Sequence, residues 1–332
     1  MEEARVEQLY EWMDKTTTDI QQYTDETYVE SLTRALELLF FQHVEEEENE
    51  IFAKRLQEAL KEVQKFSFTK DTIRSSSQLA ILKGMKDHTQ QQHEMTPETI
   101  ALFIGYLADQ LMKRRKHVRL FDPACGTGTL LTGVMKQLTQ EVTAYASEID
   151  PTLIHLAVVN ANLQQYEVEF FHQDSLRPFL LDPVDIVAID LPVGYYPDDV
   201  HAANFELAAN EGHAYAHHLF LEQSLTYTSP GGYVIAVIPQ FLFESDQSDQ
   251  LHAFMKKHAH IIGVLELPKT AFKSEQSRKS IFILEKKGTH TTGVQQPLLV
   301  QMPSFKEVQA MEQMIVQIGE WFQTHIHSKE GK

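Results

Sequence analysis

The most distinctive chemical pattern in the sequence is a glycine-containing turn that is followed by a carboxylate. The turn occupies residues 122–128, reads Asp-Pro-Ala-Cys-Gly-Thr-Gly, and follows the apolar segment Val118–Phe121. Glu148 comes twenty residues after Gly128, at the end of the next apolar segment. Glycines let the backbone approach a ligand closely, and a distant carboxylate can accept hydrogen bonds from ribose hydroxyls. The pattern therefore predicts the first turn of a nucleotide-binding α/β unit.

Two common phosphate-binding patterns do not fit this turn. A dinucleotide fingerprint would need glycine at position 131, which is Leu131 here. The G-x-x-x-x-G-K-[ST] pattern of a triphosphate-binding loop is also absent from the sequence. The turn is therefore expected to serve a nucleoside ligand of another kind.

The turn resembles motif I of S-adenosylmethionine (SAM)-dependent methyltransferases. Its Pro-Ala-Cys-Gly variant is similar to that of the adenine-specific amino methyltransferases of DNA modification systems. Residues 93–100, His-Glu-Met-Thr-Pro-Glu-Thr-Ile, look like the motif that precedes motif I in the DNA methyltransferases of type I restriction-modification systems. The resemblance continues through residues 231–233 and 264–268 and covers roughly residues 90–290. It implies that SAM is the cofactor and that methyl transfer to an amino group is the activity.

The resemblance also implies a role for each part of the cofactor site. Glu148 would accept from the ribose hydroxyls, Ile149 would pack on the adenine ring, and a Thr-Pro turn at Thr96 would lie against the methionine end. Asp174 would accept from the adenine amino group, although a turn-stabilising aspartate stays open as the alternative. The full expected set of cofactor-binding residues is Thr96, Asp122, Ala124, Cys125, Gly126, Thr127, Gly128, Glu148, Ile149, Asp174 and Ser175.

The expected catalytic motif follows the fourth strand and departs from the family pattern. Family members carry Asn/Asp-Pro-Pro-aromatic there: the first side chain accepts from the target amino group, and the ring stacks on an extruded base. Here residues 190–193 read Asp-Leu-Pro-Val, so Asp190 keeps the acceptor and Pro192 keeps the turn stiff. The stacking ring is missing at Val193. We predict Tyr195 or Tyr196 as the substrate-binding ring that replaces it.

The substrate is less well defined than the cofactor. A net charge of −18 disfavours DNA as a partner, because nucleic-acid affinity depends on neutralising phosphates. The basic run Lys113–His117 is expected to be a solvated helix end. After Leu284 about fifty residues remain, which leaves no room for a target-recognition domain of about 100 residues.

Three hypotheses about the activity follow. The first, which we favour, is a SAM-dependent N-methyltransferase of the adenine-specific DNA type. The second is a methyltransferase that acts on another amino or amide group, such as an RNA base or a protein glutamine. The third is a SAM-binding regulatory protein that has lost catalysis.

Strands and helices alternate along the part of the chain that carries these motifs. The expected strands are Val118–Phe121, Val142–Ser147, Val168–His172, Asp185–Asp190, Tyr233–Ile238, Ile261–Leu267 and Ser280–Leu284. The expected helices are Thr129–Leu138, Pro151–Leu163, Ala214–Thr226 and Phe305–Phe322. The alternation predicts a seven-stranded, mostly parallel, doubly wound α/β sheet of the Rossmann-like methyltransferase type. The last two strands lack an intervening helix and are expected to pair antiparallel.

A helical domain is expected to precede the methyltransferase domain, with bounds of 1–90 and 91–332. Residues 1–66 show helical spacing of apolar residues and hold 17 acidic and 7 basic residues. The run Glu45–Glu48 is expected in a solvated turn, and the polar stretch Ser75–Gln92 is expected to mark the boundary. Thr96 is expected to cap the next helix, with Pro97 as its first residue. The helical domain is interpreted as a cap or as a surface for a protein partner.

Several classes of protein are excluded by composition. No apolar run reaches the ~18 residues of a membrane helix, so no membrane partner is expected. A single cysteine, Cys125, rules out an internal disulfide and suits a cytoplasmic location. It is interpreted as a small residue packed under the cofactor loop, with a reactive thiol as the alternative. No metal is expected, because the ligand spacings are absent. Four histidines are placed on helix surfaces or in the core, namely His201, His213, His217 and His218.

Overall fold

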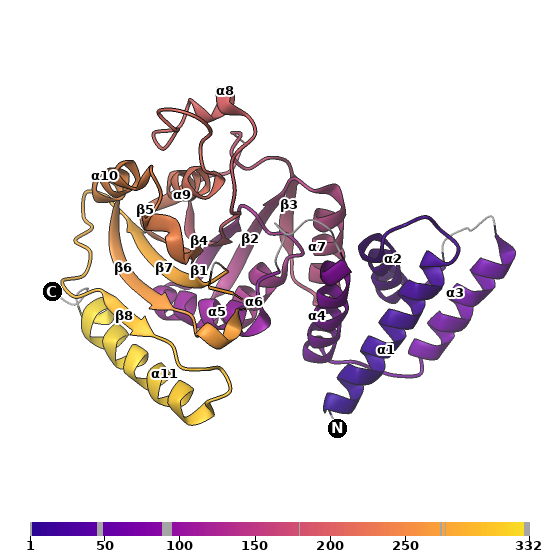
Figure 1. Ribbon diagram of the computed structural model, residues 1–332. Helices are drawn as coiled ribbons and strands as arrows, with labels where there is room; N and C mark the ends of the chain where they lie inside the picture. Colours follow the sequence, from indigo (N-terminus) through magenta and orange to yellow (C-terminus); the bar gives the residue numbers. More distant parts are fainter. Residues whose placement is uncertain are drawn as a thin grey trace.

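The computed structural model describes residues 2–44, 49–87, 95–178, 180–272, 274–275 and 277–328. It contains a helical N-terminal part and an α/β part, which lie side by side (Figure 1). The expected location of Glu45–Glu48 in a turn falls outside the described residues. No helix in the described part of the chain combines the length and the apolar character needed to cross a membrane.

An eight-stranded sheet forms the centre of the α/β part, in the order β3-β2-β1-β4-β5-β7-β6-β8. The strands are β1 (His117–Asp122), β2 (Glu141–Glu148), β3 (Val168–His172), β4 (Val184–Asp190), β5 (Thr228–Pro239), β6 (Ala259–Glu266), β7 (Lys279–Lys286) and β8 (Leu298–Gln301). Only β7 runs antiparallel to its neighbours, β5 and β6, among the described strands. The first residue of β7 therefore lies at the edge where β4 and β5 end.

The seven predicted strands are all present, and the expected antiparallel pairing of the last two is confirmed. The count of seven was one too low, because β8 adds a strand at the sheet edge. This strand has four residues and pairs only with β6. So short an edge strand carries too little of the period-2 alternation to be recognised in a sequence.

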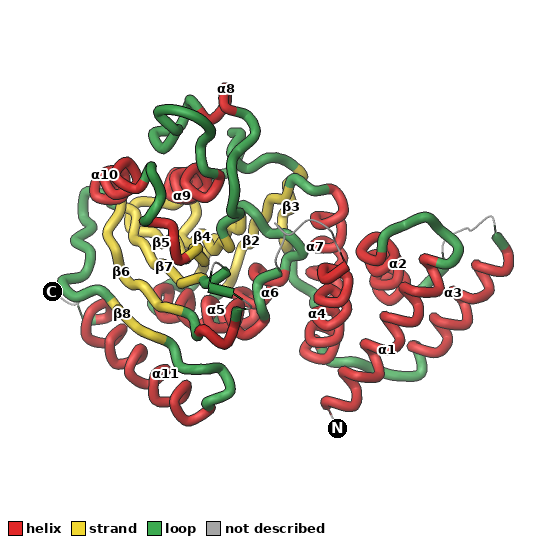
Figure 2. Tube along the Cα trace, in the orientation of Figure 1, coloured by secondary structure: helices red, strands yellow, loops and turns green. Residues whose placement is uncertain are grey.

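Helices cover both faces of the sheet (Figure 2). On one face lie α5 (Glu98–Met112), α6 (Thr129–Gln137) and α11 (Val308–Phe322); on the other lie α9 (Ala216–Tyr227) and α10 (Ser248–His258). Successive side chains of a strand point to opposite faces. In β4, Ile186 and Ala188 accordingly join the first core, whereas Val187 and Ile189 join the second. A strand buried on both faces needs the continuous apolar run that the sequence shows there.

The N-terminal part consists of α1 (Glu2–Gln21), α2 (Tyr28–Phe41), α3 (Glu50–Val63) and α4 (Lys70–Asp87). Its core includes the fully buried Leu9 and Leu32 and continues into Leu156 of α7 (Pro151–Leu163). The shared core places the helical part against the β3 side of the sheet, as Figure 1 shows. The expected domain bounds and the expected partner surface stay predictions.

One local feature was not anticipated and one local prediction was wrong. Within the stretch Ser75–Gln92, which was expected to mark the boundary between the two parts, α4 continues to Asp87. Polar contacts hold this helix, for example the bond from Ser76 Oγ to the Val6 carbonyl at 2.9 Å, and apolar periodicity cannot reveal them. The next helix, α5, begins at Glu98 with Pro97 as its N-cap, one residue later than expected. The Thr96 hydroxyl is thereby left for another partner.

Candidate active site

A cavity of about 1040 Å³ lies at the carboxyl ends of β1, β2 and β4. Because these strands are parallel, the loops that follow them meet at one edge of the sheet. The predicted residues that line the cavity are Thr96, Ala124, Cys125, Gly126, Thr127, Glu148, Ile149, Asp174, Ser175, Asp190, Pro192, Tyr195 and Tyr196. Asp122 and Gly128 belong to the same turn but do not line it. Ligand sites commonly measure about 300–1,000 Å³, so the cavity has room for a nucleoside cofactor and a second group.

The two glycines of the turn serve different purposes. Both have positive φ, +51° at Gly126 and +75° at Gly128, a conformation that favours glycine. A Cβ atom on Gly126 would meet no heavy atom within 4 Å, so this position opens onto free space. A Cβ atom on Gly128 would approach the Ala157 Cβ to 3.2 Å. Gly126 therefore leaves room for a ligand, whereas Gly128 lets α7 pack closely against the turn.

Glu148 joins the glycine turn to the end of β2. Its side chain accepts three backbone N–H bonds, from Gly126 to Oε2 at 2.9 Å and from Ile149 and Asp150 to Oε1 at 2.9 and 3.0 Å. The residue is buried but still lines the cavity. A carboxylate offers about four lone-pair positions, so one remains for a ligand hydroxyl. The expected ribose acceptor is thus fixed in orientation by its own loop.

Asp122 provides a buried carboxyl group beneath the same turn. It is fully buried, and Oδ1 accepts from the Ala124 N–H at 3.2 Å. Oδ2 has no hydrogen-bond partner among the described residues. Burial raises the pKa of Asp122 well above its ordinary value, and the nearby carboxylates of Glu148 and Asp190 raise it further. Asp122 does not line the cavity, so its expected role as a cofactor-binding residue stays a prediction.

Asp174 is occupied by contacts within the protein. Oδ1 accepts from the Leu176 N–H at 2.9 Å, as expected for the alternative of a turn-stabilising aspartate. Oδ2 accepts from the Tyr196 hydroxyl at 2.5 Å. Burial is the main cause that raises the pKa of Tyr196, and the hydrogen bond to Asp174 raises it further. The neighbouring Ser175 is buried, and its hydroxyl has no partner in the described part of the chain. The adenine end of the predicted site therefore contains a preformed Asp–Tyr pair.

Asp190 ends β4 and is held by two side chains from distant parts of the chain. Oδ2 accepts from the Thr96 hydroxyl at 2.9 Å, and Oδ1 accepts from Lys279 Nζ at 2.8 Å. The Lys279 and Asp190 side chains are only 17% and 14% exposed. Sequence reasoning missed Lys279, because only the antiparallel direction of β7 brings its first residue to this edge. The acceptor predicted to be catalytic thus takes part in a half-buried ion pair.

The two tyrosines predicted to bind substrate have different surroundings. Tyr196 is buried and bonded to Asp174, so its ring belongs to the wall of the cofactor end. Tyr195 is 61% exposed and stacks on Tyr215, with ring centroids 4.9 Å apart. Tyr195 is therefore the ring that a planar substrate can reach.

Cys125 is a packed residue of the turn. It is buried, and its N–H donates to the Ser147 carbonyl at 3.0 Å. Burial raises the pKa of the Cys125 thiol well above its ordinary value. A thiol that resists ionisation is a poor nucleophile, so the structure favours the interpretation as a small residue under the loop.

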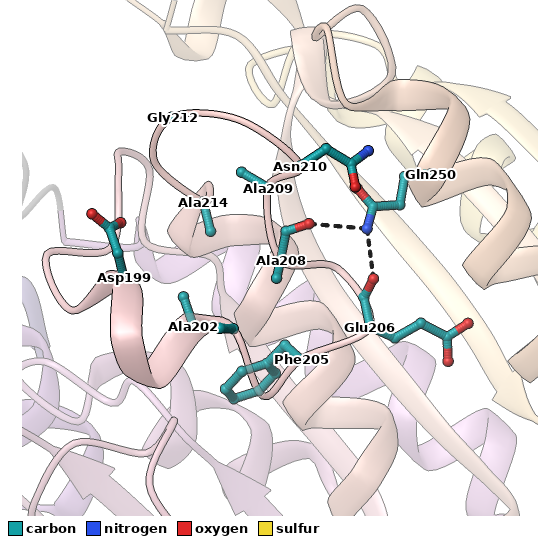
Figure 3. Close-up of a pocket in the computed structure, with 11 residues that line it drawn as sticks. Asp199, Ala202, Phe205, Glu206, Ala208, Ala209, Asn210, Gly212, Ala214 and Gln250 are labelled. Atoms are coloured by element: carbon teal, nitrogen blue, oxygen red, sulfur yellow. Dashed lines mark hydrogen bonds between the residues drawn. The ribbon is translucent and has the colours of Figure 1, made fainter.

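A second cavity of about 400 Å³ lies beside α8 (Asp199–Ala202) and the loop that follows it (Figure 3). Gln250 of α10 donates from Nε2 to the carbonyls of Glu206 and Ala208 at 2.6 and 3.0 Å, which closes one side. This cavity shares no lining residue with the larger one and contains none of the predicted site residues. The predicted site residues therefore lie at the larger cavity and not at this one.

The basic run Lys113–His117 lies away from the cavity. It ends at the first residue of β1, whereas the cofactor turn follows the last residue of that strand. Arg115 pairs with Asp185 at 3.0 Å, near the start of β4. The run therefore lies at the opposite edge of the sheet and does not line the candidate site.

His217 and His218 lie in the core, which was one of the two locations expected for them, and their exposed fractions are 1% and 0%. Burial lowers the pKa of His217 to about 3, and the neighbouring His218 adds to this effect. Burial also lowers the pKa of His218, to about 4. The unfolded chain therefore binds more protons than the folded one below about pH 6.5. Each histidine makes its full contribution to the free energy of unfolding above that pH. This contribution falls as the pH falls, by at most about 2 kcal/mol per histidine at pH 5.

Urea unfolding at pH 5 to 7 measures this effect. Replacing His218 with leucine should flatten the pH dependence of the unfolding free energy. The matched control is His213→Gln, an exposed histidine that pairs with Asp199. An unchanged pH dependence in the His218 variant would show that its burial does not govern acid stability.

The strand order, the glycine turn after β1 and the carboxylate that ends β2 together define a class I SAM-dependent methyltransferase. The model of the family described as N-6 DNA Methylase matches residues 85–330, and the YtxK N-terminal helical domain matches residues 7–85. The chain belongs to the N-6 DNA methylase family.

Relatives agree with this assignment. A Bacillus subtilis (strain 168) protein called YtxK is 43% identical over 325 residues, which is 97% of this chain and 99% of the relative. A Listeria monocytogenes crystal structure, provisionally assigned as a class I SAM-dependent methyltransferase, is 38% identical with a TM-score of 0.89, covering 96% and 99% of the two chains. The modification subunit of a provisionally assigned type I restriction enzyme from Vibrio vulnificus is 15% identical, with a TM-score of 0.61 over 85% and 68%, and shares the fold.

Proposed function

We propose that this protein transfers the methyl group of SAM to an exocyclic amino group, in the manner of adenine-specific DNA methyltransferases. The observation that supports the proposal is one continuous cavity that joins the glycine turn and Glu148 to Asp190. Family membership supports the same reaction class. The predicted cofactor site and the predicted amino-group acceptor thus line one cavity.

The residues of the chain would act mainly by binding and orientation. Glu148 would hold the ribose, and Gly126 would leave room for the methionine part of the cofactor. Bound SAM supplies an activated methyl group. Asp190 would accept a hydrogen bond from the substrate N–H and so aim the nitrogen lone pair. Correct orientation of two reactants alone can lower a barrier by several kcal/mol.

A second candidate is methyl transfer to an amide or amino group outside DNA. The net charge of −18 and the aliphatic Val193 at the position of the stacking ring support it. Losing a stacked ring weakens capture of a base by about 1–3 kcal/mol. An RNA base or a protein glutamine presents a similar N–H group to Asp190.

Transfer of tritium-labelled methyl from SAM distinguishes the candidates. The purified protein is incubated with DNA, RNA and a protein extract, and SAM binding is measured by calorimetry in parallel. Label in DNA adenine supports the first proposal, and label in RNA or protein supports the second. Binding of SAM with no label in any pool points to a regulatory protein, and no binding at millimolar SAM contradicts every form of the proposal.

Tyr195 is expected to supply the stacking that Val193 cannot. Replacing it with alanine should weaken substrate capture by about 1–3 kcal/mol, which appears as a higher KM with SAM affinity unchanged. Tyr23→Ala is the matched control, because Tyr23 is a partly exposed tyrosine of the N-terminal part. Full substrate binding in both Tyr195→Ala and Tyr196→Ala would contradict a stacking role for this pair.

A further inference from the structure

The substrate end of the cavity presents an acceptor and a donor side by side. The Asp190 carboxylate and the Lys279 ammonium both line the cavity, with Oδ1 and Nζ 2.8 Å apart. The Thr96 hydroxyl bonds the other carboxylate oxygen, so three elements fix the pair: the segment before α5, the end of β4 and the start of β7. The orientation of the pair is thereby set before a substrate arrives.

Both members of this pair have hydrogen-bonding capacity to spare. An ammonium group carries three N–H donors, and Asp190 is the only hydrogen-bond partner of Lys279 Nζ among the described residues. Each Asp190 oxygen accepts one side-chain bond and has a second lone pair. A ligand in the cavity can therefore donate to Asp190 and accept from Lys279 at the same time.

We propose that Lys279 is a specificity-determining residue that recognises an acceptor atom adjacent to the reacting amino group. This inference rests on the proposed function. The substrate class is an amide or amidine edge, in which one carbon is bonded both to the NH2 group and to a nitrogen or oxygen atom with a free lone pair, as in adenine or a primary carboxamide. The NH2 group donates to Asp190, and its neighbour accepts from Lys279.

The same pair disfavours a simple alkyl amine. Such an amine has no adjacent acceptor, so it leaves the Lys279 donors unpaired inside the cavity. It is also protonated near neutral pH and would bring a second cation against Lys279. Selection of this kind leaves a buried polar group unsatisfied when the wrong substrate binds, which is an effective basis for discrimination.

Two arginines in the same cavity provide a contrast. Arg177 pairs with Asp198 at 2.7 Å and Arg278 pairs with Glu275 at 2.8 Å. Neither contacts Asp190, whereas Lys279 does. Lys279, and neither arginine, is therefore placed to recognise the atom beside the reacting amino group.

Paired substrates with and without the acceptor test this inference. One pair is a single-stranded oligonucleotide with adenine or 1-deazaadenine, which lacks the N1 acceptor. The other is a peptide with glutamine or ornithine, in which a CH2 replaces the carbonyl. The wild type should prefer the acceptor-bearing member of the pair it labels by about 10- to 150-fold in kcat/KM, as expected for a bond to a charged donor.

Lys279→Met should remove most of this preference by slowing only the acceptor-bearing substrate. Lys279→Arg should restore part of it, and the matched control Arg278→Gln should keep the wild-type preference. SAM affinity and the thermal midpoint are measured for each variant. If Lys279→Met does not fold because Asp190 loses its cation, the Asp190→Asn/Lys279→Met double variant replaces it.

The outcomes separate the inference from the proposed function. Label with an unchanged preference in the Lys279→Met variant overturns the inference and leaves the function intact. An equal loss of methyl transfer in the Lys279→Met and Arg278→Gln variants, with a size that depends on salt concentration, also overturns the inference. Such a result would favour phosphate binding by both residues. No label from either pair overturns both.

Discussion

Replacing Asp190 with alanine is expected to lower methyl transfer by at least about 100-fold and to leave SAM binding largely intact. The side chain is the predicted acceptor for the substrate amino group, and misplacement of a reacting group by about 1 Å can cause a loss of that size. Among the described residues, the side-chain hydrogen bonds of Asp190 go to Thr96 and Lys279, and none goes to the glycine turn. Single-turnover transfer and calorimetry with SAM measure the two effects separately.

Two variants control for folding and charge. Asp190→Asn keeps an acceptor oxygen and the shape of the side chain. Asp199→Asn removes a carboxylate that lies outside the large cavity. Because the alanine variant leaves the Lys279 ammonium without its carboxylate, its thermal midpoint is measured as well. A stable Asp190→Ala protein that transfers methyl at the wild-type rate would contradict the assignment.

Replacing Glu148 with alanine is expected to weaken SAM binding by about 1.5–3 kcal/mol, the usual range for hydrogen bonds to a charged group. The loss has two sources. The ribose acceptor disappears, and the N–H groups of Gly126, Ile149 and Asp150 lose the carboxylate that positions the turn. Calorimetry gives the affinity, and the thermal midpoint without SAM gives the contribution of the turn.

Glu148→Gln separates the loss of the ribose acceptor from the loss of the turn contacts, because the glutamine amide oxygen still accepts a hydrogen bond from part of the turn. Glu141→Gln, at the exposed first residue of the same strand, is the matched control. SAM affinity that does not change in the Glu148→Ala variant would rule out the ribose contact.

The fold could be predicted because local patterns determine it. Apolar strands alternated with helices, and the continuous apolar run of β4 followed from burial on both faces. The cofactor end was predictable for a similar reason: Gly126 and Gly128 lie within a few residues of each other, and Glu148 ends the next strand. Parallel neighbours bring such positions together without further information.

The substrate end was less predictable because its contacts join residues far apart in the chain. Lys279 reaches Asp190 across 89 positions, and Thr96 reaches it across 94. The bond between Tyr196 and Asp174 likewise depends on how two loops meet. Neither a spacing nor a periodicity records such contacts, so Tyr195 and Tyr196 could not be told apart from the sequence.

The helical part contributes to the cavity wall, and this links cofactor binding to the docking of that part. Met85 of α4 lines the cavity, and the buried Arg74 of the same helix pairs with Glu98 at the start of α5. A ligand that binds only the docked arrangement stabilises it by RT ln(1 + [L]/Kd), about 2.7 kcal/mol at a hundredfold excess over Kd. Protection of α4 from proteolysis should therefore rise with SAM concentration, and a partner that pulls this helix away would lower the affinity for SAM by the same factor by which SAM lowers the affinity for the partner.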